Sequence, residues 1–161
     1  MSSVFLISVC LCLSSGLLAA YGTFVPCPPG WTQSGSRCFG YFNQPRTWAD
    51  AETACISFGG NLASIRSAAE HAFLKDFIVR ATGTHKTTWI GGHDSVKEGT
   101  WMWSDGSTFN YRNWNAGEPN NCCGGEHCLT FNWGPALCTG NWNDYSCNNQ
   151  VSFVCSRDVC V

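Results

Sequence analysis

The cysteines constrain the fold of this chain more than any other feature. The sequence contains twelve, of which Cys10 and Cys12 lie in an apolar amino-terminal run and ten lie beyond it. An even number of cysteines in a small exported chain favours a framework of disulfide bonds over zinc binding. Spacing alone leaves the pairing open. The ten are Cys27, Cys38, Cys55, Cys122, Cys123, Cys128, Cys138, Cys147, Cys155 and Cys160.

The amino-terminal run predicts export. Residues 4–20 are apolar, rich in Leu, Ser and Cys, and end in small residues, which is typical of a secretory signal peptide. We expect residues 1–20 to be removed, with cleavage between 20 and 22. A membrane anchor is the alternative, but a span needs about 20 consecutive apolar residues, and this run is shorter and interrupted by serines. The predicted localisation is secreted and extracellular, without a membrane span.

The remaining chain has the length of one domain. With 161 residues in all and about 100–200 residues per domain as the usual range, we place a single domain at 27–155 and a short tail at 156–161. The net charge is −2, and the nine basic residues are scattered along the chain. Nucleic acid and acidic membrane surfaces are therefore not favoured, because both call for a basic patch.

Two helices are predicted in the first half. Thr47 and Ser67 each start a capping box with an acidic residue three positions later, and apolar residues then recur at helical spacing. The first helix should stop at Gly59-Gly60 and the second near Ala81. His71 lies on the second helix and is expected to be a polar surface residue.

Short β-favouring runs surround and follow these helices. They cover residues 39–43, 61–65, 87–91, 101–103, 129–133, 140–142 and 151–155. In the last run, alternation places Val151, Phe153 and Cys155 on one face. Residues 92–128 show little periodicity, and we expect a long structured loop there, because eight tryptophans in the chain argue against disorder.

Within this loop, residues 114–128 carry many oxygen donors and neither lysine nor arginine. A second short stretch at 141–144 adds more. Calcium takes six to eight oxygen ligands from carboxylates, amides, carbonyls and water. The two stretches therefore predict a calcium site, with a polar surface loop that binds nothing as the plain alternative. The candidate metal ligands are Glu118, Asn120, Glu126, Asn143 and Asp144.

The order of these residues resembles the primary calcium and sugar site of C-type lectin domains. The matching motifs are Glu118-Pro119-Asn120, Glu126 eight positions after Glu118, and Trp142-Asn143-Asp144. The supporting frame is Cys27-Pro28-Pro29-Gly30-Trp31, Trp89-Ile90-Gly91-Gly92, Trp101-Met102-Trp103-Ser104-Asp105-Gly106 and Phe153-Val154-Cys155. The resemblance implies an α+β fold with two helices, two small antiparallel sheets and a long disulfide-tethered loop. It covers roughly residues 27–155.

The resemblance also implies part of the disulfide pattern. The implied bridges are Cys27–Cys38, Cys55–Cys155 and Cys128–Cys147. For the remaining cysteines we predict a Cys123–Cys138 bridge across the loop. Cys122 and Cys160 would then pair within the chain or with another copy, which makes a homo-oligomer through either residue possible.

The roles implied by the resemblance concern both calcium and sugar. Glu118, Asn120, Glu126 and Asn143 would bind the sugar as well as the ion, and Asp144 would contribute side-chain and backbone oxygen. Relatives that prefer galactose carry Gln-Pro-Asp, so Glu-Pro-Asn here implies mannose-type glycans. The physical basis is the exchange of a hydrogen-bond acceptor and a donor across the ion. Trp133 or Tyr145 is a candidate to stack on the sugar face.

A second calcium site is not expected. Asp94 and Glu98 match the auxiliary site of the family, but Asn121 and His127 stand where acidic residues would be, which weakens the attraction for calcium. A solvated turn is the plain alternative for Asp94 and Glu98. Zinc bound by Cys122, Cys123, His127 and Cys128 is rejected, because an exported chain favours disulfide formation.

The function predicted from the sequence is that of a secreted calcium-dependent lectin acting in innate immunity. Catalysis is not expected, because the sequence lacks a recognisable nucleophile and base. Glu118 and Glu126 would be held ionised as calcium ligands, which is wrong for a general acid. Two alternatives stay open on the same fold: a type II antifreeze protein that adsorbs to ice, and a venom-type module that binds a protein.

Overall fold

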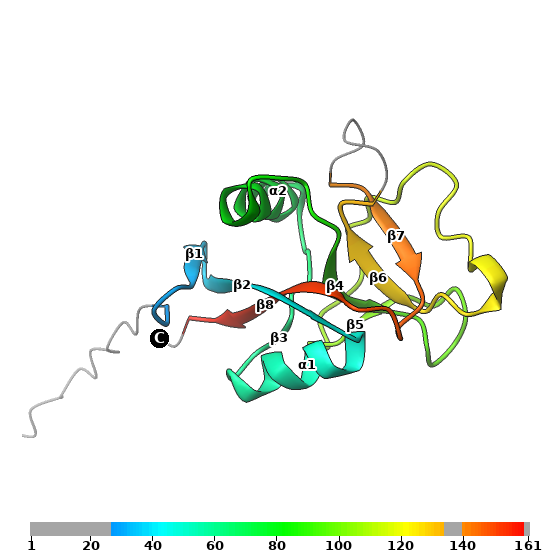
Figure 1. Cartoon of the computed structure of the whole chain (residues 1–161), viewed down its shortest axis with the longest axis horizontal. Helices are drawn as coiled ribbons and strands as arrows, with labels where there is room; N and C mark the ends of the chain where they lie inside the picture. The colour runs from blue at the N-terminus through cyan, green and yellow to red at the C-terminus, as the bar shows by residue number, and fades with distance from the viewer. Residues whose placement is uncertain (1–26, 134–139, 160–161) are drawn as a thin grey trace, which may run out of the picture.

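The computed structural model describes residues 27–133 and 140–159. Within these ranges the chain forms two α-helices, eight strands and one short 3-10 turn, η1 (Figure 1). The predicted signal peptide, the Cys123–Cys138 bridge and any pairing of Cys160 lie outside the described residues and side chains. In chain order the elements are β1 (Thr32–Ser34), β2 (Arg37–Arg46), α1 (Trp48–Ser57), β3 (Asn61–Leu62), α2 (Ala68–Thr82), β4 (Thr88–His93), β5 (Met102–Trp103), η1 (Cys122–Gly124), β6 (Cys128–Phe131), β7 (Trp142–Tyr145) and β8 (Val151–Asp158).

Both helices begin at the predicted caps. The Thr47 hydroxyl accepts a hydrogen bond from the N–H of Asp50 at 3.2 Å, and the Ser67 hydroxyl accepts one from the N–H of Glu70, also at 3.2 Å. These bonds satisfy N–H groups that have no partner inside the helix. Helix α2 ends at Gly83, whose φ of 75° suits glycine. No helix in the described ranges combines the length and apolar character needed to cross a bilayer.

The strands form one mixed sheet, whereas two separate antiparallel sheets were expected. Its path runs β1-β2-β8-β4-β6-β7, with β3 paired to β8 and β5 paired to β4. The difference arises because β4 pairs in parallel with β8, at Thr88 with Ser152 and Trp89 with Phe153. This parallel pairing of two strands joins the two antiparallel groups. The α+β class itself is confirmed.

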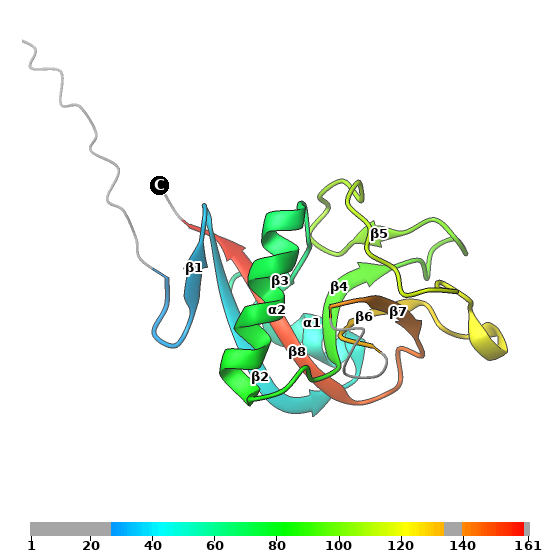
Figure 2. The same ribbon diagram turned by 90° about the horizontal axis from the view of Figure 1, so that it is seen from above.

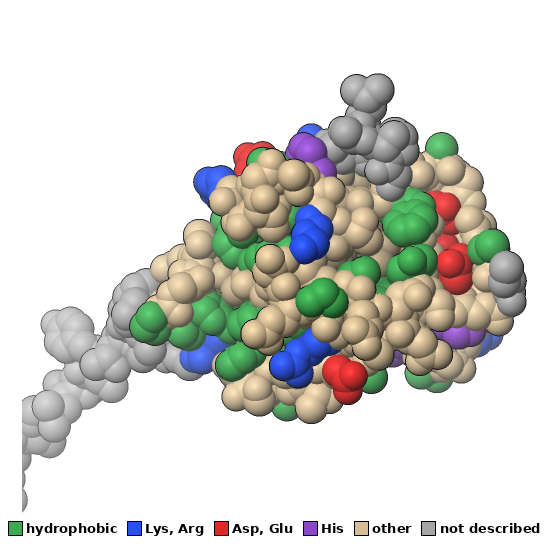
Figure 3. All heavy atoms as spheres, in the orientation of Figure 1, with side chains coloured by type: hydrophobic (Ala, Val, Ile, Leu, Met, Phe, Trp, Pro, Cys, Tyr) green, Lys and Arg blue, Asp and Glu red, His purple; other side chains and the backbone are tan. Residues whose placement is uncertain are grey.

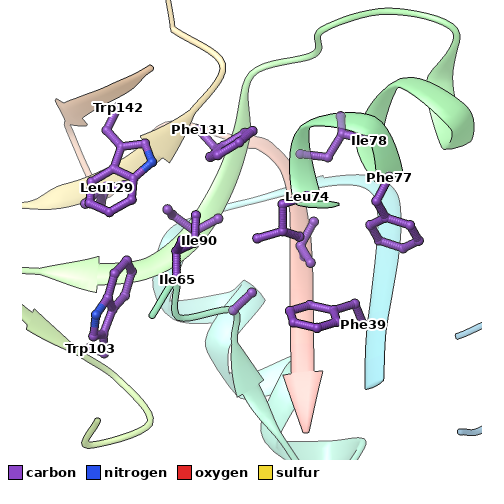
Figure 4. Close-up of a cluster of buried hydrophobic side chains, with 12 residues drawn as sticks. Phe39, Ile65, Leu74, Phe77, Ile78, Ile90, Trp103, Leu129, Phe131 and Trp142 are labelled. Carbon is purple, nitrogen blue, oxygen red and sulfur yellow. The ribbon is translucent and has the colours of Figure 1, made fainter. Parts of the chain in front are cut away.

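The two helices cover opposite sides of the central strands (Figures 1 and 2). Leu74 of α2 belongs to one buried cluster, which Figure 4 shows, and Ala51 of α1 belongs to another. Strand β8 supplies Val154 to the first cluster and Phe153 to the second. The predicted alternation in β8 is therefore confirmed, but its other face is buried as well, because each face meets a helix.

The three disulfide bonds implied by the resemblance are confirmed. They join Cys27 to Cys38, Cys55 to Cys155, and Cys128 to Cys147. The second bond ties α1 to the central strand β8. The third ties the start of β6 to the segment after β7, and it therefore fixes the base of the long loop.

Aromatic packing holds the long loop between β4 and β6, which confirms that the loop is structured. The ring centroids of Trp103 and Phe109 lie 5.6 and 5.9 Å from that of Trp142, which is fully buried. The N–H of Trp142 donates to the carbonyl of Asn113 at 2.9 Å, and the N–H of Asn115 donates to the carbonyl of Trp142 at 2.8 Å. These bonds place the loop beside β7.

His71 is more buried than expected for a polar surface residue. Its ring centroid lies 5.1 Å from that of Phe131 and 5.8 Å from that of Tyr111, and its Nε2 lies 2.7 Å from the carbonyl oxygen of Gly140. Burial lowers the pKa of this histidine. The expectation of a solvated position was wrong because these partners come from distant parts of the sequence.

Candidate functional site

The predicted site is assembled from the loop at 118–126 and strand β7. The buried Asp144 carboxylate accepts hydrogen bonds from the N–H groups of Asn120, at 3.0 Å, and Asn121, at 2.6 Å. The Glu118–Pro119 peptide bond is cis, as the proline allows. Asn121 has a φ of 44°, a left-handed conformation that asparagine tolerates better than most residues. The loop therefore turns so that its backbone donors face the strand.

Glu126 closes the other end of the loop around η1. Its Oε2 accepts a hydrogen bond from the N–H of Cys122 at 3.0 Å, and its own N–H donates to Oδ1 of Asn121 at 3.1 Å. A carboxylate that accepts a hydrogen bond from a backbone N–H is held in one orientation. Glu126 is thus held on the same side of the loop as Asn121.

The acidic side chains of the site crowd one another electrostatically. Burial raises the pKa of Glu118 to about 7, and a hydrogen bond with Asp144 and the negative charges of Asp144 and Glu126 add to the effect. Burial also raises the pKa of Glu126, and the charge of Asp144 contributes, while the bond from Cys122 opposes it. A raised carboxyl pKa shows that the ionised form is poorly compensated by neighbouring groups.

A divalent cation fits this arrangement. Oε2 of Glu118 is buried and accepts no hydrogen bond from the described residues. Such an atom is costly unless a partner satisfies it. The side chains around it are carboxylates and amides, which are the donors that calcium prefers. The residues present therefore suit calcium, and Glu118, Glu126 and Asp144 would be its anionic ligands.

The two asparagines of the predicted set lie beside these carboxylates. Asn143 is 3% exposed, and its Nδ2 donates to the carbonyl oxygen of Asp144. The Asn120 side chain is exposed, while its backbone N–H is held by Asp144. Both Asp144 carboxylate oxygens already accept backbone bonds, but each oxygen keeps a further lone pair. The assignment of all five residues as ligands stays a prediction.

The aromatic residues proposed for sugar stacking pack against each other. The ring centroids of Trp133 and Tyr145 lie 5.0 Å apart, and both side chains are half-buried. Tyr145 follows Asn143 by two positions in β7, so their side chains lie on the same face of the strand. Tyr145 is therefore the better placed of the two to contact a ligand near Asn143.

A second group of metal-type donors lies next to this loop. Asp94, Glu98 and His127 bring one ligand atom each to within 4.8 Å of one another. Asp94 is only 1% exposed, which rules out a solvated turn for this residue. Sequence reasoning placed Asp94 and Glu98 together but counted His127 against a metal. The rejection of a cysteine zinc site stands, because Cys128 is bonded to Cys147.

Other surface features do not match a predicted site. A polar cleft of about 170 Å³ is lined by residues that include Arg37, Asp105 and Arg157, but Arg37 is already paired with Glu70 at 3.1 Å. Acidic side chains appear at the loop end of the molecule in Figure 3. The cleft is therefore separate from the candidate site, whose loop carries the exposed Asn120 side chain.

Comparison with known proteins identifies relatives of this domain. The family described as "Lectin C-type domain" matches residues 44–157. Ladderlectin of Oncorhynchus mykiss is 49% identical over 124 residues, which cover 77% of this chain and 64% of ladderlectin. The galactose-specific lectin nattectin of Thalassophryne nattereri is 46% identical over 133 residues, which cover 83% of this chain and 81% of nattectin.

The solved structures add one further comparison. A calcium-independent type II antifreeze protein superposes with a TM-score of 0.74 at 32% identity, over 86% of this chain and 98% of that protein. Its similarity shows that one architecture serves proteins described by quite different activities. The match over most of the domain, with the two helices, the mixed sheet and the disulfides, shows that this chain belongs to the C-type lectin family.

Proposed function

We propose that the chain is a calcium-dependent lectin that binds mannose-type sugars at the loop end of the domain. The observation that carries the proposal is the buried, unsatisfied Oε2 of Glu118. Burial raises the pKa of this residue to about 7, and the two neighbouring carboxylates add to the rise. An uncompensated group of acids is unfavourable alone, and a divalent cation removes the repulsion. The site is therefore best explained as a cation site.

Five residues would hold the ion, and four of them would also contact the sugar. Bound calcium supplies coordination positions for two neighbouring sugar hydroxyls. Glu118 and Glu126 accept hydrogen bonds from those hydroxyls, because ionised carboxylates are acceptors only. Asn120 and Asn143 donate from their amide groups to the hydroxyl lone pairs. Asp144 orients the loop through the N–H groups of Asn120 and Asn121.

The proposed preference for mannose-type sugars rests on the order Glu118-Pro119-Asn120. The acid precedes the amide, and this order sets which hydroxyl proton is accepted and which oxygen receives a donor. Nattectin is described as galactose-specific, so the overall similarity does not decide the sugar. The residues of the loop are a better guide to the sugar preference than the overall similarity. The binding test therefore includes both mannose and galactose.

Chelator elution tests the proposed function directly. The mature protein is applied with calcium to immobilised mannose and, in parallel, to immobilised galactose. We expect retention on mannose, release by a calcium chelator, and weaker retention on galactose. Retention on neither resin would overturn the lectin proposal. Retention that survives the chelator would overturn its calcium dependence.

An ice-binding role is the alternative that the structural comparison raises, because a type II antifreeze protein shares the fold. Thermal hysteresis without sugar binding would favour that role. The neighbouring carboxylates of the loop argue against ice binding without calcium, because charged groups favour hydration and the binding of a cation. Secretion fits this proposal, since the sugars in question lie outside cells, and the signal peptide at residues 1–20 remains a prediction.

A further inference from the structure

His71 of α2 lies where the two segments of the candidate site come together. Its Nε2 lies 2.7 Å from the carbonyl oxygen of Gly140, which shortly precedes β7. Gly140 has a φ of 89°, and a Cβ atom at this position would lie 3.0 Å from Cε1 of the imidazole. The backbone can approach the ring this closely because position 140 is a glycine. This contact ties the start of β7 to the helix.

Asn113 brings the long loop to the same point. Its Nδ2 lies 3.2 Å from the carbonyl oxygen of Gly140, 3.2 Å from Oδ1 of Asn141 and 3.1 Å from Nε2 of His71. A carbonyl oxygen only accepts, so Nε2 of His71 carries the hydrogen and donates it to Gly140. The two hydrogens of the Asn113 amide then serve Gly140 and Asn141. The Gly140 carbonyl therefore accepts one bond from the helix and one from the loop.

Two further hydrogen bonds extend this junction to the proposed calcium ligands. Nδ2 of Asn141 donates to Oδ1 of Asn115 at 3.2 Å, and the carbonyl of Asn115 accepts the N–H of Glu118 at 3.0 Å. On the other side, Asn141 leads along the backbone into β7, which carries Asn143. His71 is thus connected to Glu118 through side-chain amides and to Asn143 through the chain itself.

The surroundings of the His71 ring favour its neutral form. Its centroid lies 5.1 Å from that of Phe131 in β6, 5.8 Å from that of Tyr111 and 6.5 Å from that of Trp142 in β7. In the described ranges, Lys75 of the same helix and Tyr111 are the titratable groups that face the ring. Burial lowers the pKa of His71, the bond to the backbone carbonyl opposes this shift, and the charge of Lys75 adds to it. A second proton on this ring is therefore costly while the ring stays in place.

We propose that His71 is a positioning residue of the sugar site, whose neutral imidazole holds the loop at 113–118 against the start of β7. This role rests on the proposed function, since it concerns the same site, but the junction itself is measurable without sugar. The imidazole acts through its N–H bond to Gly140 and through its packing beside Trp142. Loss of that bond, or a charge on the ring, should loosen the two segments together and move the proposed ligands apart.

Substitutions at position 71 separate the hydrogen bond from the packing. His71→Gln keeps an N–H donor for Gly140 and cannot be charged, whereas His71→Phe keeps a ring and loses the donor. In excess calcium at pH 7.5, mannose affinity should stay within about twofold of wild type for His71→Gln and fall about fivefold for His71→Phe, as loss of one buried hydrogen bond implies. His85→Phe, at an exposed histidine, is the matched control and should leave the affinity unchanged. Equal mannose affinity in wild type and His71→Phe would overturn the role.

A pH profile distinguishes positioning from simple packing. Between pH 7.5 and pH 5, wild type should lose more mannose affinity than His71→Gln, because only wild type charges this ring, and the loss common to both belongs to Glu118. In NMR spectra of isotope-labelled protein without calcium or sugar, the backbone amide signals of Asn115 and Asn141 should shift with the same midpoint as the ring of His71. His71→Gln should lack that shift.

Each measurement has a result that counts against the role of His71. Affinity profiles of wild type and His71→Gln that coincide, or amide signals that do not follow the ring, overturn it. If wild type binds neither mannose nor galactose, the proposed function fails, and the amide signals alone then decide whether His71 positions the loop.

Discussion

The backbone N–H of Asn121 donates a 2.6 Å hydrogen bond to the buried carboxylate of Asp144. This bond, with the one from Asn120 at 3.0 Å, joins the loop at 118–126 to strand β7. Two backbone donors on one carboxylate keep the loop in place, because hydrogen bonds to a charged acceptor are stronger than those between neutral groups. The geometry of the proposed site therefore depends on Asp144 before any ion binds.

Asp144→Asn should loosen this junction. The amide replaces one acceptor oxygen with a donor that faces a backbone N–H, so we expect a loss of about 1.5–3 kcal/mol in the free energy of unfolding, the range for bonds to charged groups. Calcium affinity should fall as well. Urea unfolding in the presence of chelator measures the first effect. Asp158→Asn, at an exposed position at the end of β8, serves as the control and should change neither quantity.

Calcium binding should release protons below neutral pH. The pKa of Glu118 is raised from 4.5 to about 7 in the metal-free protein, so near pH 6 the folded protein holds a proton that calcium must displace. Calcium affinity should therefore fall on acidification from pH 7 to pH 5, by at most about tenfold per pH unit for one proton. Calorimetry in two buffers of different ionisation enthalpy measures the release. Identical heats in both buffers would contradict it.

The raised pKa of Glu118 also determines how the unfolding free energy of the metal-free protein changes with pH. Because the pKa of Glu118 is higher in the folded than in the unfolded chain, its contribution to stability is full below about pH 4.5 and is lost as the pH rises through about 7. Removing the acid removes this dependence. In chelator, Glu118→Gln should thus show a flatter profile of unfolding free energy between pH 5 and 7.5 than wild type. If the profiles of wild type and Glu118→Gln run parallel, the pH dependence does not come from Glu118.

Exchanging the acid and the amide of the loop should change the sugar preference. The double variant Glu118→Gln and Asn120→Asp reverses donor and acceptor positions across the ion. We expect the ratio of mannose to galactose affinity to fall about tenfold or more. Glycan titrations with both sugars measure the ratio. The control is the calcium affinity of the variant, which should lie within about threefold of wild type. Loss of the ion would instead weaken the affinity for both sugars alike.

Trp142 should be the most costly residue to truncate near the site. It is fully buried among Trp103, Phe109 and neighbouring rings, so Trp142→Ala should cost about 3–5 kcal/mol of unfolding free energy. Trp133→Ala removes a half-buried ring and should cost under about 2 kcal/mol. Denaturant unfolding compares the two. Equal losses would show that the ring cluster does not support the loop.

Much of the fold could be predicted from local sequence signals. The caps at Thr47 and Ser67 depend on residues three positions apart, so both helix starts were correct. The disulfide bonds followed from a resemblance and were confirmed. The parallel pairing of β4 with β8 was missed, because pairing between distant strands leaves no local pattern. The burial of both faces of β8 was missed for the same reason.

The candidate site was predicted unevenly. The loop and β7 meet as expected, and Asp144 joins them. The resemblance placed His127 at the same auxiliary position as Asp94 and Glu98, and the β4–β6 pairing brings the three residues together. His71 was misplaced because its aromatic neighbours lie on other elements. Residue type indicated the chemistry, but strand register decided which residues meet.

The proposed recognition loop and the first strand of the domain lie at opposite ends of the molecule (Figures 1 and 2). β1 and the end of β8 lie at the side away from the loop that contains η1 (Figures 1 and 2). Copies tethered through that side can all point their loops toward one target surface. When such copies share a target, each later contact forms at a high effective concentration, so even a weak monosaccharide affinity becomes firm attachment to a densely glycosylated cell.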